Sequence, residues 1–268
     1  MADRPVRTPR SARVLETIPL TPHMIRVVLG GDGLAGFGAG EFSDHYVKLR
    51  ITPPGEAEAR TRTYTVSEWD AERGRLTIDF VHHGDTGVAG PWALNAKPGD
   101  ELLLLGPGGA YTPDELAAWH LMVGDESVIP AISASLVRVP DGVPVHVLVE
   151  VAGPEEEQPL ETPGDLRLTW LHRNGDPGAL ADAVAALDFP PGAVHAFVHG
   201  EASTVRAIRR HLLVDRGLPR EALSISGYWK RERTEEGWRE EKAEWNRQVE
   251  LDAATSGPPP AAPRAPRA

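Results

Sequence analysis

The spacing of apolar residues changes near residue 115, and this change constrains the fold more than any other feature of the chain. Before it, short strand-like runs are separated by Gly, Pro and Asp, which is typical of a small antiparallel barrel. These runs are ARVLETIPL, MIRVVLG, HYVKLRI, RTYTVSEW, RLTIDFVHH and ELLLLGP. After it, strand-like runs alternate with helical stretches of about 10 to 15 residues, which indicates βαβ units and a parallel sheet. The sequence therefore predicts a two-domain β plus α/β protein, with an N-terminal antiparallel β-barrel followed by a parallel-sheet α/β domain.

Shifts in composition suggest where the domains begin and end. We expect the barrel domain to span residues 8–115, and the α/β domain with a charged C-terminal helix to span residues 118–250. One helix, at about Pro91 to Ala96, interrupts the barrel strands. Residues 253–268 are rich in Pro and Ala, and this composition predicts a disordered tail.

A highly charged stretch, residues 230–250, has the periodicity of a surface helix. Trp238 and Trp245 share one face of such a helix. We expect the two indole rings to anchor this helix to the body of the protein rather than to bind a cofactor.

The composition excludes several classes of function. The 268 residues include no cysteine, which removes disulfides, thiol nucleophiles and cysteine-ligated iron–sulfur clusters. A net charge of −11 disfavours nucleic-acid and anionic-membrane partners, although a local basic pocket can still bind an anionic small molecule. The longest aliphatic run, Leu102 to Leu105, is too short to span a bilayer, and the N-terminal residues lack the apolar core of a signal peptide. We therefore expect a cytoplasmic monomer without membrane insertion.

The run RTRTYTVSEWD carries a guanidinium and a phenol on one strand. Side chains two residues apart share a face of a strand, so Arg62 and Tyr64 point the same way. An arginine can hold a pyrophosphate through paired hydrogen bonds, and a tyrosine ring can lie against a flat ring system. Thr65 joins them only if the chain turns at that point. Taken alone, the run favours an ordinary barrel strand over a binding site.

Residues 79–93, DFVHHGDTGVAGPWA, lead from a strand through a glycine-rich loop into a helix start. The exposed N–H groups and the dipole at a helix start suit a phosphate, and Pro91 suits a first-turn position. A plain strand-to-helix connection explains the same residues. His82 and His83 project to opposite faces of a strand and lack further ligands, so we expect no metal site.

Two further stretches follow strands of the predicted parallel sheet. VGDESVIPAI, residues 123–132, joins the first strand to the first helix, and VHGEASTVRAIRRHL begins at the equivalent edge of a later strand. Ligands of open α/β sheets bind at the carboxyl ends of such strands. Caps of helix starts explain the same polar residues, and the two interpretations are compatible.

Together these segments resemble the siderophore-interacting protein family, which comprises FAD-containing ferric-siderophore reductases of the ferredoxin-reductase-like superfamily. The resemblance rests on RTYTV, DFVHHGDTG, WALNAKPGD, GDESVIPAI, HGEASTVRAIRRHL and GYWKRERTEE, which follow the family's order along the chain. It implies an NAD(P)H-dependent flavin reductase that reduces Fe(III)-siderophore and releases Fe(II) in iron acquisition. A flavin connects the two partners because it accepts an electron pair and can release electrons singly.

The resemblance also implies which residues bind FAD. Arg62 would face the pyrophosphate, Tyr64 would pack on the isoalloxazine, and Thr65 would lie near its N5 atom. The full set implied for FAD is Arg62, Tyr64, Thr65, Asp79, Phe80, Val81, His83, Ala89, Trp92 and Ala93. Asp79, Phe80 and Val81 would act mainly through their backbone. Family members usually continue with G-P-A-S-x-W-A, and here Val88 replaces the proline and Gly90 the serine. The lost hydroxyl puts one phosphate contact in doubt, and backbone N–H groups can replace it.

For the nicotinamide cofactor, NADH or NADPH, the resemblance implies two loops and the end of the last strand. These residues are Gly124, Asp125, Glu126, Ser127, Gly200, Glu201, Tyr228 and Trp229. The two aromatic residues would lie near the flavin, either as core residues or as part of the nicotinamide site. Lys48 and Lys230 are the candidates for attracting an anionic ferric siderophore, and ordinary solvated lysines are the alternative.

Two other functions stay open at this level. One is an FAD-dependent reductase with a different electron acceptor, and the other is a siderophore-binding carrier that performs no reduction. A carrier needs neither the R-x-Y-T strand nor a second α/β domain, so the motifs favour a reductase. Neither the siderophore nor the choice between NADH and NADPH follows from them.

Overall fold

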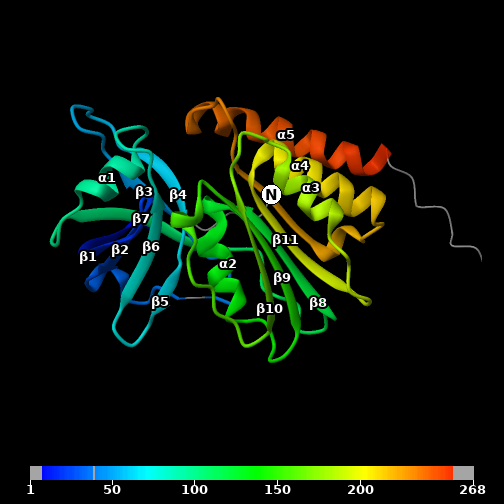
Figure 1. Ribbon diagram of the computed structural model, residues 1–268. Coiled ribbons are helices and arrows are strands. Elements are labelled where there is room, and N and C mark those ends of the chain that lie inside the picture. Colours follow the sequence, from blue (N-terminus) through cyan, green and yellow to red (C-terminus); the bar gives the residue numbers. More distant parts are fainter. Residues whose placement is uncertain (1–7, 39, 256–268) are drawn as a thin grey trace, which may run out of the picture.

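The computed structural model describes residues 8–38 and 40–255, which form two domains lying side by side (Figure 1). The first domain holds the strands β1 (Arg10–Thr21), β2 (Met24–Gly30), β3 (Tyr46–Ile51), β4 (Arg60–Thr65), β5 (Glu68–Asp70), β6 (Arg75–Val81) and β7 (Glu101–Gly108). They pair antiparallel in the order β4-β3-β7-β1-β2-β6-β5. Because the outermost strands β4 and β5 are neighbours in the sequence, the sheet curls back on itself around a buried core. The predicted antiparallel barrel is confirmed.

The helix α1 (Ala89–Asn95) covers one end of this barrel. It begins two residues before the predicted start at Pro91. Proline is tolerated at this third helical position because the first N–H groups of a helix have no intrahelical acceptor. Ala89 and Ala93 face the barrel core.

The second domain is a parallel sheet of β8 (Trp119–Asp125), β9 (Pro144–Val151), β10 (Asp165–His172), β11 (Val194–Glu201) and β12 (Leu223–Trp229). Their order is β10-β9-β8-β11-β12, so successive strands are added on one side of β8 as far as β10 and then on its other side from β11, which makes the boundary between β8 and β11 the switch point of the sheet. The helix α2 (Ile129–Leu136) covers one face, and α3 (Ala179–Ala186) and α4 (Ala202–Arg210) cover the other (Figure 1). Short turns complete the domains: Asp32–Leu34, Glu126–Val128, Pro154–Glu156, His211–Asp215 and Arg220–Ala222. The predicted α/β domain is confirmed.

The last helix, α5 (Glu235–Thr255), lies over α4 and reaches toward the barrel (Figure 1). Trp238 and Trp245 are buried, with ring centroids 5.7 Å apart, so the prediction that they anchor the helix is confirmed. The helix starts five residues later than residue 230 because Glu232, with φ of 59°, adopts a left-handed turn. It also runs into the segment predicted to be disordered, while residues 256–268 of that segment lie outside the described residues. No helix in the described part of the chain is both long and apolar enough to cross a bilayer.

A shared apolar cluster joins the two domains. Met24 and Tyr111 of the barrel domain pack with Met122 and Phe197 of the parallel sheet. The hydroxyls of Ser43 and Ser135 lie 2.8 Å apart across the same boundary. The carboxyl ends of β8, β11 and β12 therefore face the barrel across a packed interface.

Candidate functional site

Arg62 is a buried cation in the middle of β4. Its Nε atom lies 2.7 Å from Glu235 and its Nη2 atom lies 2.7 Å from Glu236, both in the first turn of α5. The side chain is only 6% exposed, and a buried charge of this kind is tolerated only when it is paired. Arg239 adds a second link between α5 and β4, donating to the backbone oxygen of Thr61 over 2.7 Å. Sequence reasoning found the arginine and missed its partners, because they come from a helix at the other end of the chain.

Three aromatic rings extend from β4 to α1. The ring centroid of Tyr64 lies 4.4 Å from that of Phe80, which lies 5.6 Å from that of Trp92. Burial raises the pKa of Tyr64, so its hydroxyl stays protonated at neutral pH. The structure thus brings together these three residues, which the sequence assigned to a flavin site from separate motifs.

The segment from Asp79 to His83 turns most of its side chains away from any ligand. Asp79 accepts two hydrogen bonds from Arg26, at 2.7 and 2.9 Å, and the side chain of Phe80 is fully buried. Val81 packs against the cluster between the domains, while His83 is exposed. The side chain of Asp79 is thus engaged within the protein, and its backbone groups are what this residue can offer a ligand.

Gly90 occupies a position where a larger residue is crowded. A Cβ atom at this position would meet the Cβ of His82 at 3.0 Å and its Cα at 3.1 Å. These contacts are tighter than ordinary packing, so a serine would require the backbone of His82 to move. The close approach of α1 to the end of β6 gives a physical reason for glycine at this position.

Asp125 connects the two loops predicted at the carboxyl end of the parallel sheet. Its Oδ1 atom accepts from the backbone and hydroxyl of Ser127, at 2.9 and 2.5 Å. Its Oδ2 atom accepts from the backbone of Glu201 and the indole of Trp229, both at 2.9 Å. Burial, reinforced by Glu126, raises the pKa of this carboxyl to about 6. One carboxylate thus holds the first loop, the second loop and the last strand together.

Two glycines allow this close packing. Gly200 has φ of +124°, and a Cβ there would lie 2.6 Å from the Oδ2 atom of Asp125. A Cβ at Gly124 would lie 2.5 Å from Val128. Both predicted glycines are therefore required by the local geometry, whatever ligand the site accepts.

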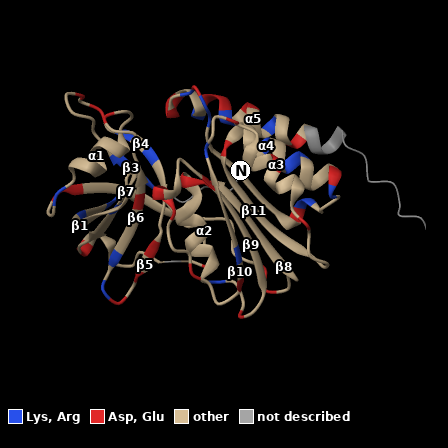
Figure 2. Ribbon diagram, viewed as in Figure 1, with Lys and Arg blue, Asp and Glu red and all other residues tan. Residues whose placement is uncertain are grey.

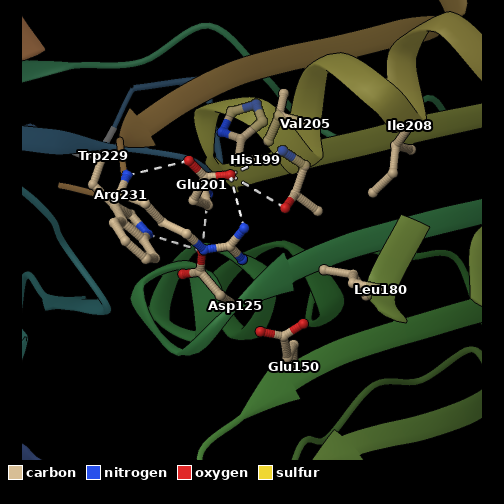
Figure 3. A pocket seen from close by; sticks show the side chains of 10 residues that line it. Asp125, Glu150, Leu180, His199, Glu201, Val205, Ile208, Trp229 and Arg231 are labelled. Atoms are coloured by element: carbon tan, nitrogen blue, oxygen red, sulfur yellow. Dashed lines mark hydrogen bonds and ion pairs between the residues drawn. The ribbon is translucent and has the colours of Figure 1, made fainter. Parts of the chain in front are cut away.

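A pocket opens beside Asp125 between the ends of β8, β9, β11 and β12 (Figure 3). Glu201 lies on one side, where it caps α4 by accepting from the backbone of Ser203 and Thr204, each over 2.9 Å. Glu150 and Arg231 also line the pocket, and neither was predicted from the sequence. The rule that ligands meet carboxyl ends of strands would have indicated Glu150, which is the second-last residue of β9.

Tyr228 links this pocket to the barrel. Its hydroxyl lies 3.1 Å from Nδ1 of His199, and its side chain also interacts with that of Thr65 at the end of β4. Burial raises the pKa of Tyr228 and lowers that of His199 to about 3, so both side chains are uncharged at neutral pH. Thr65 is buried at the end of β4, at the domain interface. Trp229, which follows Tyr228 on β12, is partly exposed.

The two lysines proposed to attract substrate have different surroundings. Lys48 is exposed on β3 and lies opposite Thr63, so it leaves the ribbon on the face opposite to Arg62. The ammonium group of Lys230 lies 2.7 Å from Glu241, which also pairs with Arg233 (Figure 2 shows both signs of charge along α5). The charge of Lys230 is therefore compensated within the protein, whereas Lys48 is exposed. The two lysines do not contribute equally to the predicted cationic patch.

Two family models match the chain and together span both domains. The model described as siderophore-interacting FAD-binding domain matches residues 13–60 and 50–111, and the model described as siderophore-interacting protein matches residues 117–232. The chain belongs to the siderophore-interacting protein family. Its resemblance to that family at the level of motifs is thus confirmed, and its first domain is an FAD-binding domain.

Relatives with named activities support an oxidoreductase. Ferric vibriobactin reductase ViuB of Vibrio cholerae is 33% identical, over 83% of this chain and 90% of the relative. The NADPH-dependent ferric-chelate reductase of Escherichia coli is 29% identical, over 82% of this chain and 92% of the relative. A siderophore utilization protein from T. fusca, known from a crystal structure, is 35% identical in sequence. The match covers 85% of this chain and 94% of the T. fusca chain, with a TM-score of 0.77.

Proposed function

We propose that this siderophore-interacting protein is an FAD-containing reductase that uses NADH or NADPH to reduce ferric siderophores and release Fe(II). The observation that carries the proposal is Arg62, a buried guanidinium on the FAD-binding domain. Its partners are the carboxylates of Glu235 and Glu236 at the start of α5. Carboxylate and phosphate oxygens accept the same N–H groups, so a pyrophosphate can take the place of Glu235 and Glu236. The aromatic residues Tyr64 and Trp92 supply the flat apolar surface that the ring system of FAD requires.

When bound, FAD supplies the conversion between a two-electron donor and a one-electron acceptor. The residues of the chain then have the task of binding and orienting. Arg62 holds the negative end of the cofactor, and Thr65 with Tyr228 borders it at the domain interface. Since His199 and Tyr228 are both uncharged, this pair gives the interface polar groups without adding a charge of its own.

The nicotinamide substrate belongs at the carboxyl end of the parallel sheet, beside the same interface. Asp125 fixes the Ser127 and Glu201 loops in one arrangement, and the point between β8 and β11 where the strand order switches sides is where ligands of such sheets bind. Trp229 lines this site, with its indole held by Asp125. A nicotinamide bound in the pocket would have to meet or displace that indole to reach the flavin.

The iron chelate must be attracted by local charge, because the protein as a whole carries −11. Lys48 is the better candidate, since Lys230 is paired with Glu241. We therefore expect Lys48→Ala to raise the half-saturating concentration of an anionic ferric chelate more than Lys230→Ala does, with unchanged FAD content. Added salt should reduce this difference, and equal losses for neutral and anionic chelates would assign the lysine a packing role instead.

The cofactor assignment is tested with Arg62→Ala. Losing a charge-assisted pair of about 1.5–3 kcal/mol should weaken FAD binding roughly ten- to hundredfold, measured by titrating apoprotein with FAD and following flavin fluorescence. Arg50→Ala is the matched control, because Arg50 lies on the adjacent strand β3, is exposed, and donates a hydrogen bond of 3.4 Å to the hydroxyl of Thr61. An affinity equal to wild type in both variants would remove Arg62 from the FAD site.

The acceptor is tested by steady-state assays with hydroxamate and catecholate ferric chelates, in which a chromogenic ferrous chelator captures the product. The proposal expects nicotinamide-dependent Fe(II) formation with at least one siderophore. A flavin-loaded protein that reduces other acceptors but no ferric siderophore would be a reductase with a different acceptor. A colourless protein that binds ferric siderophore without reducing it would be a carrier.

A further inference from the structure

Arg173 lies in a three-residue charge cluster at the carboxyl end of the parallel sheet. Its Nε atom donates to Glu150 over 2.8 Å, and its Nη1 and Nη2 atoms donate to the two carboxylate oxygens of Glu126 over 3.1 and 2.5 Å. The three residues follow or end β10, β9 and β8, which are consecutive in the sheet. The arrangement therefore joins three adjacent strand ends by one guanidinium.

This cluster lies next to the pocket at Asp125. Glu150 lines that pocket and its side chain is 6% exposed, whereas the side chain of Arg173 is 34% exposed. The Glu126 hydrogen bonds, followed by those of Glu150, raise the pKa of Arg173, which stays fully charged. One positive and two negative groups leave the cluster with a formal charge of −1.

The position of the cluster relates it to one part of a dinucleotide. If the nicotinamide end points toward Tyr228 and the barrel, the adenosine end extends along the strand ends toward β9 and β10. In such folds an acidic side chain at a strand end accepts a hydrogen bond from the 2′-hydroxyl of the adenosine ribose, and a nearby arginine accommodates a 2′-phosphate. Here the carboxylate is available at the pocket, while the arginine already has three hydrogen bonds to carboxylates.

We propose that Glu150 selects an unphosphorylated adenosine ribose and that Glu126 holds Arg173 away from a 2′-phosphate, so that the protein uses NADH in preference to NADPH. This inference rests on the proposed function, because it names which nicotinamide enters the same site. A doubly charged phosphate beside Glu150 would be repelled, and it would gain Arg173 only by breaking the bidentate contact with Glu126. The preference is then set by the two glutamates rather than by the absence of a cation.

The binding test uses calorimetry with two fragments, ADP-ribose and 2′-phospho-ADP-ribose, on the flavin-loaded protein at low ionic strength. Wild type should bind ADP-ribose at least about tenfold more tightly than 2′-phospho-ADP-ribose. Glu126→Gln should improve binding of the phosphorylated fragment about tenfold relative to ADP-ribose, because it removes the negative charge and one of the two acceptor oxygens that hold Arg173. Glu150→Gln should weaken the binding of ADP-ribose, and this loss should reduce the difference in affinity between the two fragments.

A double variant and a matched control make the test specific. Adding Arg173→Ala to Glu126→Gln should abolish the gain for the phosphorylated fragment, because the freed guanidinium is then absent. Glu157→Gln changes a glutamate that pairs with His172 nearby and should leave both affinities at wild-type values. Stopped-flow reduction of the flavin by NADH and NADPH should follow the same order in kcat/KM.

Tighter wild-type binding of 2′-phospho-ADP-ribose would overturn the inference, as would an unchanged ratio in both glutamine variants or binding of neither fragment. Failure of the proposed function gives a different pattern. If the fragments bind in the expected order but neither nicotinamide reduces the flavin, the charge cluster keeps its role and the reductase assignment fails.

Discussion

The two ends of the parallel sheet bury ionisable residues in opposite ways. At the carboxyl end, each of three buried acids accepts hydrogen bonds from backbone or side-chain N–H groups: Asp125, Glu150 and Glu201. At the amino end, the sheet buries His120 and His146, whose ring nitrogens have no hydrogen-bond partner within the described residues. These acids and these histidines are all buried, so burial alone does not separate a site from a core.

The chemistry of the residues explains the difference. Burial lowers the pKa of His120 to about 4, with His195 contributing, and burial also lowers that of His146. Both imidazoles are therefore neutral at pH 7 and pack as ring systems, His146 with Trp119 at 5.3 Å between centroids. A carboxylate cannot stay charged in such a place without donors. The loops that supply donors leave the sheet at the carboxyl end, which is where the acids and the candidate site are found.

The largest expected effect concerns Asp125. Asp125→Ala removes the acceptor for Glu201 and Trp229 and leaves their N–H groups buried, so we expect a loss of about 3 kcal/mol in the free energy of unfolding in urea. Asp165→Ala, at the exposed amino end of β10, is the control and should change little. A loss below about 1 kcal/mol for Asp125→Ala would mean that the carboxyl end is not held by this residue.

The next effect concerns acid stability at the amino end. Because the folded pKa of His120 lies below the unfolded value near 6.5, the unfolded state binds the proton first and stability falls as pH decreases from about 6.5 to 4. Leucine cannot take up this proton. Between pH 7.5 and pH 4, His120→Leu should therefore lose about 2–3 kcal/mol less of its free energy of unfolding than wild type loses.

The measurement is urea unfolding of both proteins at several pH values. His83→Gln is the control, because His83 is exposed. The acid limb of this control should coincide with that of wild type. Parallel acid limbs for wild type and His120→Leu would show that other groups cause the acid loss.

The smallest effect concerns a charge pair outside both ends. Arg247 and Glu244 pair on the exposed side of α5, where solvent screens the attraction. We expect Arg247→Ala to leave the melting temperature unchanged within error, in contrast to the buried groups of the sheet. A clear decrease would show that α5 depends on its surface charges as well as on Trp238 and Trp245.

The local pattern of the sequence was enough to predict both domains and most of the candidate site. Alternating apolar residues mark barrel strands, and strand–helix alternation marks a parallel sheet, because each pattern reflects which faces of an element are buried. The R-x-Y-T strand and the two loops at strand ends followed from the same logic. Asp125 and Glu201 within those loops were named through the family resemblance, because local periodicity indicates a loop at a strand end but not which of its side chains meets a ligand.

Contacts between distant segments were decided only by the tertiary structure. The pairing of Arg62 with Glu235 and Glu236 depends on where α5 docks, and the Arg173 cluster depends on strand order across two crossovers. The neutrality of His120 likewise depends on what covers it. A side chain's partners and its pKa are set by groups within a few ångströms in space, and sequence periodicity reports only the face on which the residue lies.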